Sequence, residues 1–444
     1  MEMTTINLPD KVKRIIDILE EAGYQAYAVG GCVRDSILGR LPDDWDITTS
    51  ATPEQVKKHF KKTIDTGIQH GTVTVMIQGE GFEVTTYRID GEYEDSRHPK
   101  EVLFTPCLEE DLKRRDFTIN AMAYNGKEIV DLFGGVEDLE NGSIRCVGNP
   151  IERFGEDALR IMRGIRFSAQ LGYEIEEETK RAISLLSPTL EHISAERIQV
   201  ELVKLVTSPN PDYLRHAFQM GITKVVLAEL DSMMDMPQNH PHHCYSVGNH
   251  ALEAMKHVEA DKVLRLAMLF HDVGKIETHT TDREGIDHFY GHARKSEMIV
   301  KSILKRLRFD NDTTAKVSKL ALYHDMKIPL EEVAMRKAIR KVGEDIMPYL
   351  WKVKRADILA QSEYKRAEKL EELIVLEKLY EEIINRKDPV SLKELAVTGK
   401  DLMDMGIPHG KQIGEILTYL LELVLEEPKR NTKEYLLQKV KEKV

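Results

Sequence analysis

The feature that most constrains the fold of this chain is a change in hydrophobic periodicity near residue 150. Before that point, helical patterns alternate with β-rich runs such as GTVTVMI (71–77) and GFEVTTYRI (81–89), which a short Gly-containing link joins as a hairpin. After it, strand alternation nearly vanishes and helical periodicity continues to the C-terminus. The pattern predicts an α+β head with a small mixed sheet, followed by a long all-α region.

The helical region is interrupted by turns rich in Pro and Gly, for example at 207–212 and 388–390. At 444 residues the chain has room for several domains. We therefore expect four parts in the order head, neck, body and tail: 1–145, 146–208, 209–385 and 386–444.

Composition limits the class of protein. The net charge is −12, and no apolar run reaches the ~18–20 residues that a membrane span requires. The first residues lack the apolar core of a signal peptide, and the four cysteines are far apart without a C-x-x-C pair. These features predict a cytoplasmic protein with reduced thiols and no zinc site. The acidic charge does not exclude a nucleic-acid partner, because locally basic stretches such as 112–116 and 301–308 coexist with it.

A Gly-Gly turn followed by two aspartates is the motif richest in chemistry. Gly30 and Gly31 precede a short helix that carries Arg34, and glycines allow the backbone to approach a phosphate closely. Asp44 and Asp46 follow, and residues two apart in a β-strand point to the same face. Hard cations such as Mg²⁺ prefer carboxylate oxygens and substrate phosphates. Asp-x-Asp alone would suit a solvated acidic strand, but with the preceding motif it predicts a nucleotidyl transferase, and no P-loop sequence is present.

Two further segments offer groups for the same site. Glu83 lies in the middle of a predicted strand, where it is either a third carboxylate for the metal or an ordinary exposed glutamate. In the segment RRDFTINAMAY, Arg114 or Arg115 could meet triphosphate oxygens. Asp116 and Asn120 could read ribose hydroxyls, although a capped helix start would explain Asp116 as well.

The segment 155–166 predicts one amphipathic helix with charged residues on the face opposite its apolar stripe. Glu156, Arg160 and Arg163 share that face. Arg160 lies four residues after Glu156 and three after Asp157, so that an ion pair at helical spacing is expected. Such a pair is either an ordinary surface contact or a device for reading bases. A carboxylate acceptor beside an arginine donor matches the Watson–Crick edges of C and A and rejects those of U and G.

Taken in order, these segments resemble the tRNA nucleotidyltransferases of the bacterial and eukaryotic class, which are relatives of the bacterial poly(A) polymerases. The resemblance covers nearly the whole chain and also includes a hinge-like DLFGGVEDL (131–139) and a buttressing AERIQVEL (195–202). It implies Asp44 and Asp46 as Mg²⁺ ligands, RRDFTINA as the ribose motif, and Asp157 and Arg160 as a protein template for the incoming base. The activity implied is addition of CTP and ATP to the 3′ end of tRNA.

Within that family, the segment 88–99 resembles the flexible loop of enzymes that add the terminal A. The stretch TIDTGIQHGTVTV stands where poly(A) polymerases carry an arginine-rich sequence. Addition of A alone stays open as an alternative to full CCA addition, which we favour. The tail TGKDLMDMGIPHGKQ resembles the part that holds the tRNA elbow, with Lys411 at a position where the family usually has proline.

The segment LFHDVGK (269–275) resembles the signature of the HD phosphohydrolases. This resemblance implies a second divalent metal centre. Its first-choice ligands are His250, His271, Asp272 and Asp357. Two further histidines, His292 and His324, are possible additional ligands. His240, His242 and His243 are interpreted as loop residues. The alternative function is therefore a metal-dependent hydrolase whose head only binds RNA.

Overall fold

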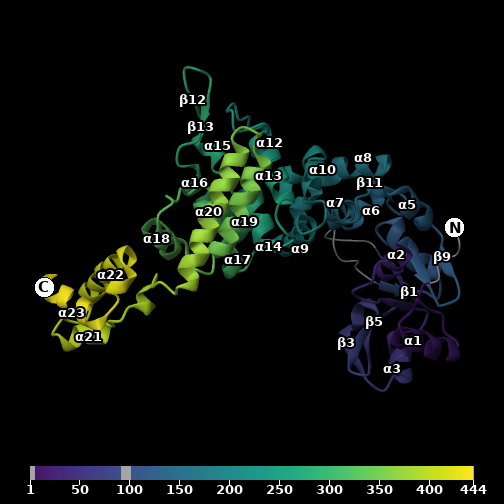
Figure 1. Ribbon diagram of the computed structural model, residues 1–444. Coiled ribbons are helices and arrows are strands. Elements are labelled where there is room, and N and C mark those ends of the chain that lie inside the picture. Colours follow the sequence, from purple (N-terminus) through teal and green to yellow (C-terminus); the bar gives the residue numbers. More distant parts are fainter. Residues whose placement is uncertain (1–5, 92–101, 444) are drawn as a thin grey trace. The chain divides into compact units, whose positions relative to one another are not determined.

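The computed structural model describes residues 6–91 and 102–443. The chain divides into two compact units, Met1–Ala228 and Glu229–Val444 (Figure 1). The first unit contains a mixed sheet and helices, and the second is largely helical. The predicted α+β head followed by a helical region is confirmed. Most of the loop that we compared with A-adding enzymes lies outside the described residues.

The head is built on a sheet whose order, in the described part of the chain, is β3-β4-β5-β2-β1-β8-β9. Its strands are β1 (Ala26–Val29), β2 (Ile47–Thr49), β3 (Thr63–Gly67), β4 (Thr72–Ile77), β5 (Glu80–Thr86), β8 (Met122–Tyr124) and β9 (Ile129–Asp131). β2 pairs in parallel with β5, and the other neighbours are antiparallel, so the sheet is mixed. The predicted hairpin is present: Gln78 and Gly79, both at positive φ, connect β4 to β5. A smaller sheet pairs β6 (Arg88–Asp90) with β7 (Val102–Phe104).

Helices complete the head, and they are α1 (Asp10–Glu21), α2 (Gly31–Ile37), α3 (Pro53–His59), α4 (Leu108–Lys113) and α5 (Gly135–Asn141). The apolar residues of α1 recur at helical spacing and are buried, namely Val12, Ile15, Ile16 and Leu19. α3 begins at a capping box in which Thr52 and Gln55 bond to each other's backbone amides, with Pro53 in the first turn.

The rest of the first unit is helical, with α6 (Pro150–Glu156), α7 (Leu159–Leu171), α8 (Glu177–Leu186), α9 (Ala195–Val206), α10 (Leu214–Gln219) and α11 (Ile222–Val226). The prediction of one continuous helix over 155–166 is wrong. α6 ends at Glu156, and Asp157 has an extended backbone with φ −140° and ψ 103°. The carboxylate of Asp157 accepts a hydrogen bond from the Leu159 amide at 3.0 Å, so it caps the next helix instead of continuing the last one. Two-residue strands β10 (Ser143–Ile144) and β11 (Glu174–Ile175) pair in parallel.

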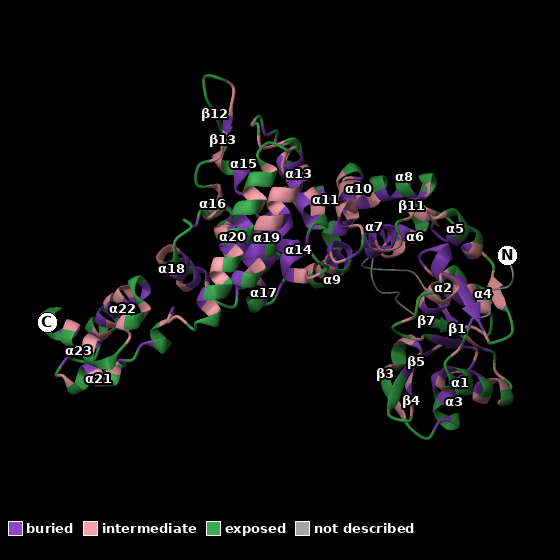
Figure 2. Cartoon of the chain, in the orientation of Figure 1, coloured by how far each residue is buried: buried purple, intermediate pink, exposed green. Residues whose placement is uncertain are grey.

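Helix α12 (Ala228–Asp235) lies at the boundary between the units. In its described residues the second unit then contains eleven α-helices: α13 (Val247–Lys256), α14 (Lys262–Phe270), α15 (Lys275–Thr278), α16 (His292–Arg306), α17 (Asn311–Tyr323), α18 (Glu332–Val342), α19 (Met347–Ala360), α20 (Arg366–Asn385), α21 (Gly399–Asp404), α22 (Lys411–Glu426) and α23 (Lys433–Lys443). A short hairpin pairs β12 (Thr280–Thr281) with β13 (Asp287–His288). α14 is central: it contacts α13, α17 and α19, and its residues from Val263 to Phe270 are buried (Figure 2). No helix among the described residues is both long and apolar enough to cross a bilayer.

Candidate functional site

A cavity of about 560 Å³ in the first unit gathers the residues predicted for nucleotide chemistry. Its walls come from the β1–α2 turn, the loop before β2, the segment after α4, and helices α7 and α9. The predicted residues that line it are Gly30, Gly31, Arg34, Asp44, Asp46, Arg115, Asp116, Asn120, Asp157, Arg160 and Arg163. Motifs that are far apart in the sequence, from Gly30 to Arg163, therefore meet in one cavity.

The Gly-Gly turn brings the backbone against an arginine. Gly30 has φ 83° and ψ −129°, which glycine adopts far more readily than other residues. A Cβ atom placed at Gly30 would lie 3.0 Å from Nη1 of Arg115. A side chain here would therefore both strain the turn and displace the Arg115 guanidinium from the cavity wall.

The two aspartates lie just before β2 and not within it, so the expectation that they occupy a strand is wrong. The carbonyl of Asp46 nevertheless accepts a hydrogen bond from the Val29 amide at 3.0 Å, which continues the β1–β2 pairing beyond the strand. Desolvation raises the pKa of the Asp46 carboxyl, Arg115 opposes the shift, and the charge of Asp44 adds to it. The backbone pairing thus holds Asp46 at the cavity, which Asp44 lines as well.

Glu83 does not line the cavity, but it lies within electrostatic reach of both aspartates. It is on β5, in register with Thr74 of β4. Desolvation raises the pKa of Glu83, and the charges of Asp46 and Asp44 raise it further. Three carboxylates within electrostatic reach of one another form a donor set suited to a hard divalent cation such as Mg²⁺.

A chain of hydrogen bonds connects the head to α7 through the ribose-motif residues. Arg34 donates to Oδ1 of Asn120 at 2.7 Å, and Asn120 donates in turn to Oδ1 of Asp116 at 3.3 Å. Arg163 donates from Nε to Oδ2 of Asp116 at 2.6 Å. Burial alone would raise the pKa of Asp116, but the charge and hydrogen bond of Arg163 outweigh it and lower the pKa to about 2. Asp116 is therefore an anion whose orientation is fixed from two sides.

The two residues predicted as a template, Asp157 and Arg160, are held by separate partners. Arg160 donates to Glu156 at 2.6 Å, as the helical spacing predicted, and also to the carbonyl of Arg114 at 3.0 Å. Asp157 instead binds both terminal nitrogens of Arg197, at 2.7 and 3.3 Å. Arg197 lies on α9, in the segment compared above with a buttressing helix, but the sequence reasoning did not assign it a role.

Two other buried groups were missed. Asp111 on α4 is fully buried, accepts from Arg114 at 2.7 Å and from the hydroxyl of Thr48 at 3.0 Å, and lies 3.6 Å from Arg115. Asp111 gave no signal because its helix has the composition of an exposed acidic turn.

Phe167 on α7 has three guanidinium groups around its ring, with Arg166 at 3.9 Å, Arg34 at 5.2 Å and Arg163 at 5.3 Å from the centroid.

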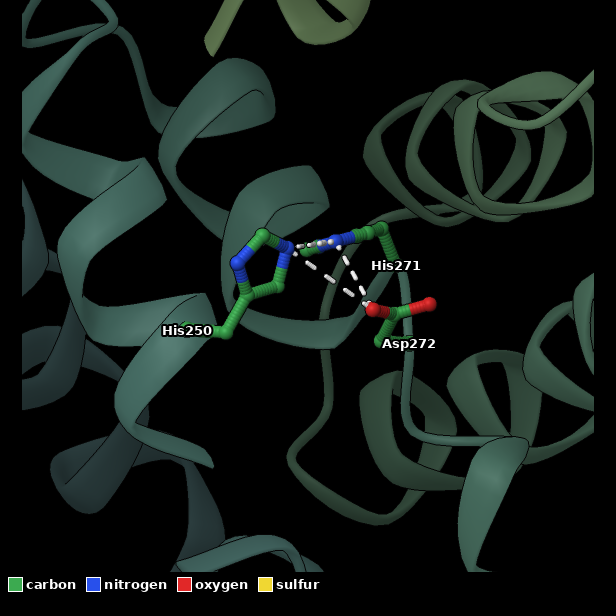
Figure 3. A group of neighbouring side chains, drawn as sticks. All are labelled: His250, His271 and Asp272. Atoms are coloured by element: carbon green, nitrogen blue, oxygen red, sulfur yellow. Dashed lines mark hydrogen bonds and ion pairs between the residues drawn. The ribbon is translucent and has the colours of Figure 1, made fainter. Parts of the chain in front are cut away.

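In the second unit, all six residues compared with the HD ligand set come together. Figure 3 shows His250 of α13 facing His271 and Asp272, which follow α14. Nε2 of His271 lies 3.3 Å from Nε2 of His250 and 3.3 Å from Oδ2 of Asp272. Oδ1 of Asp357, on α19, is 2.9 Å from Nε2 of His250.

Asp272 also faces a second group of histidines. Its Oδ1 atom lies 3.4 Å from Nε2 of His292 and 3.4 Å from Nε2 of His324, and these nitrogens are 3.2 Å apart. This buried oxygen has no hydrogen-bond partner among the described residues. One carboxylate thus serves two clusters that each have the ligand types of a metal site.

The orientation of the four imidazoles supports metal binding. Nδ1 lies close to a backbone carbonyl in each ring: 2.8 Å for His271, His292 and His324, and 3.3 Å for His250. A proton on Nδ1 satisfies that carbonyl and leaves the Nε2 lone pair directed at the centre, which is the arrangement found in metal-binding histidines. Two such nitrogens only 3.2–3.3 Å apart share either a proton or a metal ion. A cavity of about 330 Å³ opens onto this centre, and the loop residues His240 and His243 line it.

Three family models match this chain: "Poly A polymerase head domain" over residues 26–145, "Probable RNA and SrmB- binding site of polymerase A" over 172–234, and "tRNA nucleotidyltransferase domain 2 putative" over 278–440. With the carboxylates and the Gly-Gly turn described above, the fold defines a nucleotidyltransferase of the poly(A) polymerase superfamily.

The proteins that are similar to this chain over nearly its full length define a narrower family within that superfamily. The CCA-adding enzyme of Enterococcus faecalis is 36% identical over 442 residues, which cover 98% of this chain and 97% of that enzyme. The match with the enzyme of Ligilactobacillus salivarius is stronger, at 54%, but spans only 47% of this chain and 53% of that enzyme. The crystal structure of the Bacillus stearothermophilus CCA-adding enzyme in complex with CTP has a TM-score of 0.72 at 30% identity, with 97% of each chain covered. The Thermotoga maritima enzyme complexed with tRNA shares the fold, with a TM-score of 0.60 at 22% identity, over 98% of this chain and 97% of that one. The chain belongs to the family of CCA-adding enzymes.

Proposed function

We propose that this protein adds C, C and A to the 3′ end of tRNA from CTP and ATP, releasing pyrophosphate, without a nucleic-acid template. The observation that carries the proposal is the meeting of the Gly-Gly turn, two aspartates, the ribose-motif residues and the template residues in one cavity. Family membership over nearly the full length supports the same activity.

The catalytic step is assigned to the aspartates. Asp44 and Asp46, with Glu83 as a third carboxylate, would hold Mg²⁺. When bound, Mg²⁺ lowers the pKa of the primer 3′-hydroxyl and neutralises charge on the departing pyrophosphate. Arg115 and Arg34 would contact the triphosphate as bidentate donors.

Selection of the nucleotide is assigned to residues of the first unit that face the same cavity. Asn120 and Asp116 would bind the ribose hydroxyls. The carboxylate of Asp157 would accept a hydrogen bond from the exocyclic amine of C or A, while Arg160 donates to the neighbouring ring acceptor. U and G carry a carbonyl and a ring N–H at these positions, so the same pair would reject both. Arg197 is a positioning residue, because it holds both carboxylate oxygens of Asp157.

The test uses three tRNA transcripts, ending at the discriminator base, at C and at CC. Each is incubated with the full chain, Mg²⁺ and either one nucleotide or all four, and the products are sequenced. We expect all three to end as CCA. Extension of only the CC-ended transcript, by a single A, would instead identify an enzyme that adds A alone.

A matched pair of variants tests the catalytic assignment. Asp44→Asn and Asp46→Asn should each lower incorporation by at least ~10³-fold because a metal ligand is removed. Asp17→Asn is the control, since Asp17 is an exposed aspartate of α1 that lines neither cavity. Normal incorporation by Asp44→Asn would refute the assignment.

The second candidate function is metal-dependent phosphoester hydrolysis at the HD-type centre of the second unit. The specific observation in its favour is the pair of histidine clusters that share Asp272. Hydrolysis of a cyclic phosphodiester should require an added divalent metal, disappear in His271→Ala and persist in Asp44→Asn. Equal hydrolysis by wild type and His271→Ala would exclude this centre as its source.

The cytoplasmic location and the four-part division into head, neck, body and tail remain part of the proposal. Cytoplasmic location would keep all four cysteines, which are free in the structure, reduced. Limited proteolysis followed by mass spectrometry would test whether the boundaries near 145, 208 and 385 are cleaved first.

A further inference from the structure

A second cavity of about 580 Å³ opens from the nucleotide cavity within the first unit. The two cavities share wall residues on α2, on the loop before β2, and on α7 and α9, namely Arg34, Asp35, Asp43, Arg166 and Lys204. The remaining wall comes from the loop at Arg40 and Leu41, from the end of α7, and from residues 207–209 after α9. This cavity therefore borders the proposed catalytic aspartates without containing them.

The cavity carries positive charge that its own acidic groups do not neutralise. Arg34 is paired with Asp35 at 2.9 Å, and Arg166 with Glu201 at 2.5 Å. Arg40, in the loop after α2, and Lys204, on α9, are exposed, and no ion pair joins either to a described residue. Asp43 in the same wall offsets only one of these two cations, so the cavity suits an anionic ligand.

A buried hydroxyl provides independent evidence for a ligand. Ser208 lines the cavity, its side chain is only 3% exposed, and its Oγ atom has no hydrogen-bond partner among the described residues. A buried polar atom without a partner costs about 1–3 kcal/mol. A ligand that offers a hydroxyl or a phosphate oxygen here would remove this cost. Leu41, which is 95% exposed at the same cavity, offers an apolar surface to a ribose or a base.

We propose that this second cavity binds the last nucleotides of the RNA primer. Arg40 and Lys204 contact backbone phosphates, and Ser208 bonds to a ribose hydroxyl or a phosphate oxygen. The inference rests on the proposed function, and it names residues that bind the second substrate of that reaction. A nucleoside triphosphate fits this cavity less well, because its charge is concentrated, whereas a strand carries one charge per nucleotide and can pass between two separated cations.

The geometry of the reaction supports the same occupant. The primer 3′-hydroxyl and the α-phosphate of the nucleotide must meet at Asp44 and Asp46. Because the nucleotide-selecting residues line the first cavity, the primer has to arrive through an adjoining space. The second cavity adjoins the first at Asp43, one residue before Asp44.

The experiment compares steady-state kinetics of the full-length wild type, Arg40→Ala and Ser208→Ala, with CC-ended tRNA and ATP varied in turn. We expect the KM for tRNA to rise by about five- to tenfold in Arg40→Ala, a loss typical of one charged contact. The KM for ATP should stay within about twofold of the wild-type value, since Arg40 lies outside the nucleotide cavity. Ser208→Ala should raise the KM for tRNA less, and Arg40→Lys should restore most of the affinity.

A salt series adds a readout that a purely structural role would not change. The slope of log Kd for tRNA against log salt should fall by about 0.7 in Arg40→Ala, the value for one lost contact to a single strand. Lys58→Ala, on an exposed position of α3 outside both cavities, is the matched control and should behave as wild type.

An unchanged tRNA KM and salt slope in both Arg40→Ala and Ser208→Ala would overturn the inference. An equal rise in the KM for ATP would also overturn it, because the cavity would then serve the nucleotide. If the wild type extends no transcript, the proposed function fails, and direct filter binding of CC-ended tRNA to the same variants still tests the cavity.

Discussion

At the scale of single residues, the site depends on charges that are held by partners outside the motifs. Asp157 and Arg160, which the sequence predicted as a template, are each fixed by another ion pair, to Arg197 and to Glu156. The sequence predicted the Glu156–Arg160 pair because it is local. It could not predict Arg197 opposite Asp157, because that contact crosses 40 positions between two helices.

Arg197→Met should weaken base selection without removing the template. With its partner gone, Asp157 is free to rotate, and we expect kcat/KM for both CTP and ATP to fall about tenfold, equivalent to ~1.4 kcal/mol. Incorporation of UTP should rise relative to CTP. Single-nucleotide extension assays measure both ratios, with Arg181→Met, an exposed pair on α8, as the control. Unchanged discrimination would show that Arg197 has no positioning role.

Asp116 should contribute to stability near neutral pH and lose that contribution in acid. Its pKa in the folded protein is about 2, below the ordinary value of 3.8. The folded state therefore binds fewer protons than the unfolded state in this range, so its contribution is complete above pH 3.8 and is lost as the pH falls toward 2. Urea unfolding at several pH values between 2 and 5 should show a shallower pH dependence in Asp116→Asn than in wild type. Parallel curves would contradict the assignment.

At the scale of elements, periodicity predicted the hairpin β4–β5, because it depends on local apolar spacing and a short turn. It failed at Asp157, where a carboxylate that caps α7 interrupts what reads as one helix. It also placed Asp44 and Asp46 in a strand that begins only at Ile47. In both cases backbone hydrogen bonds made by or beside the functional residue decide the boundary.

Gly135→Ala should destabilise the protein through α5. A Cβ atom at Gly135 would lie 2.4 Å from the carbonyl oxygen of Thr118, which belongs to the segment RRDFTINA before β8. Backbone atoms cannot yield as a flexible side chain can, so we expect a loss of about 1–3 kcal/mol in the free energy of unfolding. Gly155→Ala is the matched control: it lies in α6 with open space around it and should be neutral or stabilising by up to ~1 kcal/mol. Equal stability of the two variants in urea would contradict this reasoning.

At the scale of the whole molecule, the chain combines two compact units that carry different candidate chemistries. The fold class was predictable because periodicity changes along the sequence. The histidine centre was suggested by resemblance, but its paired clusters were not, because the spacing of residues on five helices does not fix distances between them.

Added Mn²⁺ should stabilise the second unit selectively. Binding to the folded state alone raises its stability by about 2.7 kcal/mol at a concentration of 100 times Kd. Differential scanning calorimetry of the full chain should show an upward shift of one transition in wild type and in Asp44→Asn, but not in His271→Ala. A shift of the same size in His271→Ala would locate the ion elsewhere.

The position of Asp272 between two groups of histidines has a consequence for how this family can diverge. Its two carboxylate oxygens face separate clusters, so both clusters depend on this one residue. Loss of one histidine impairs one cluster, whereas a change at Asp272 disables both and leaves the surrounding helices free to keep their packing role. A single substitution at Asp272 would therefore remove a shared ligand from both clusters while the helices that carry them could stay in place.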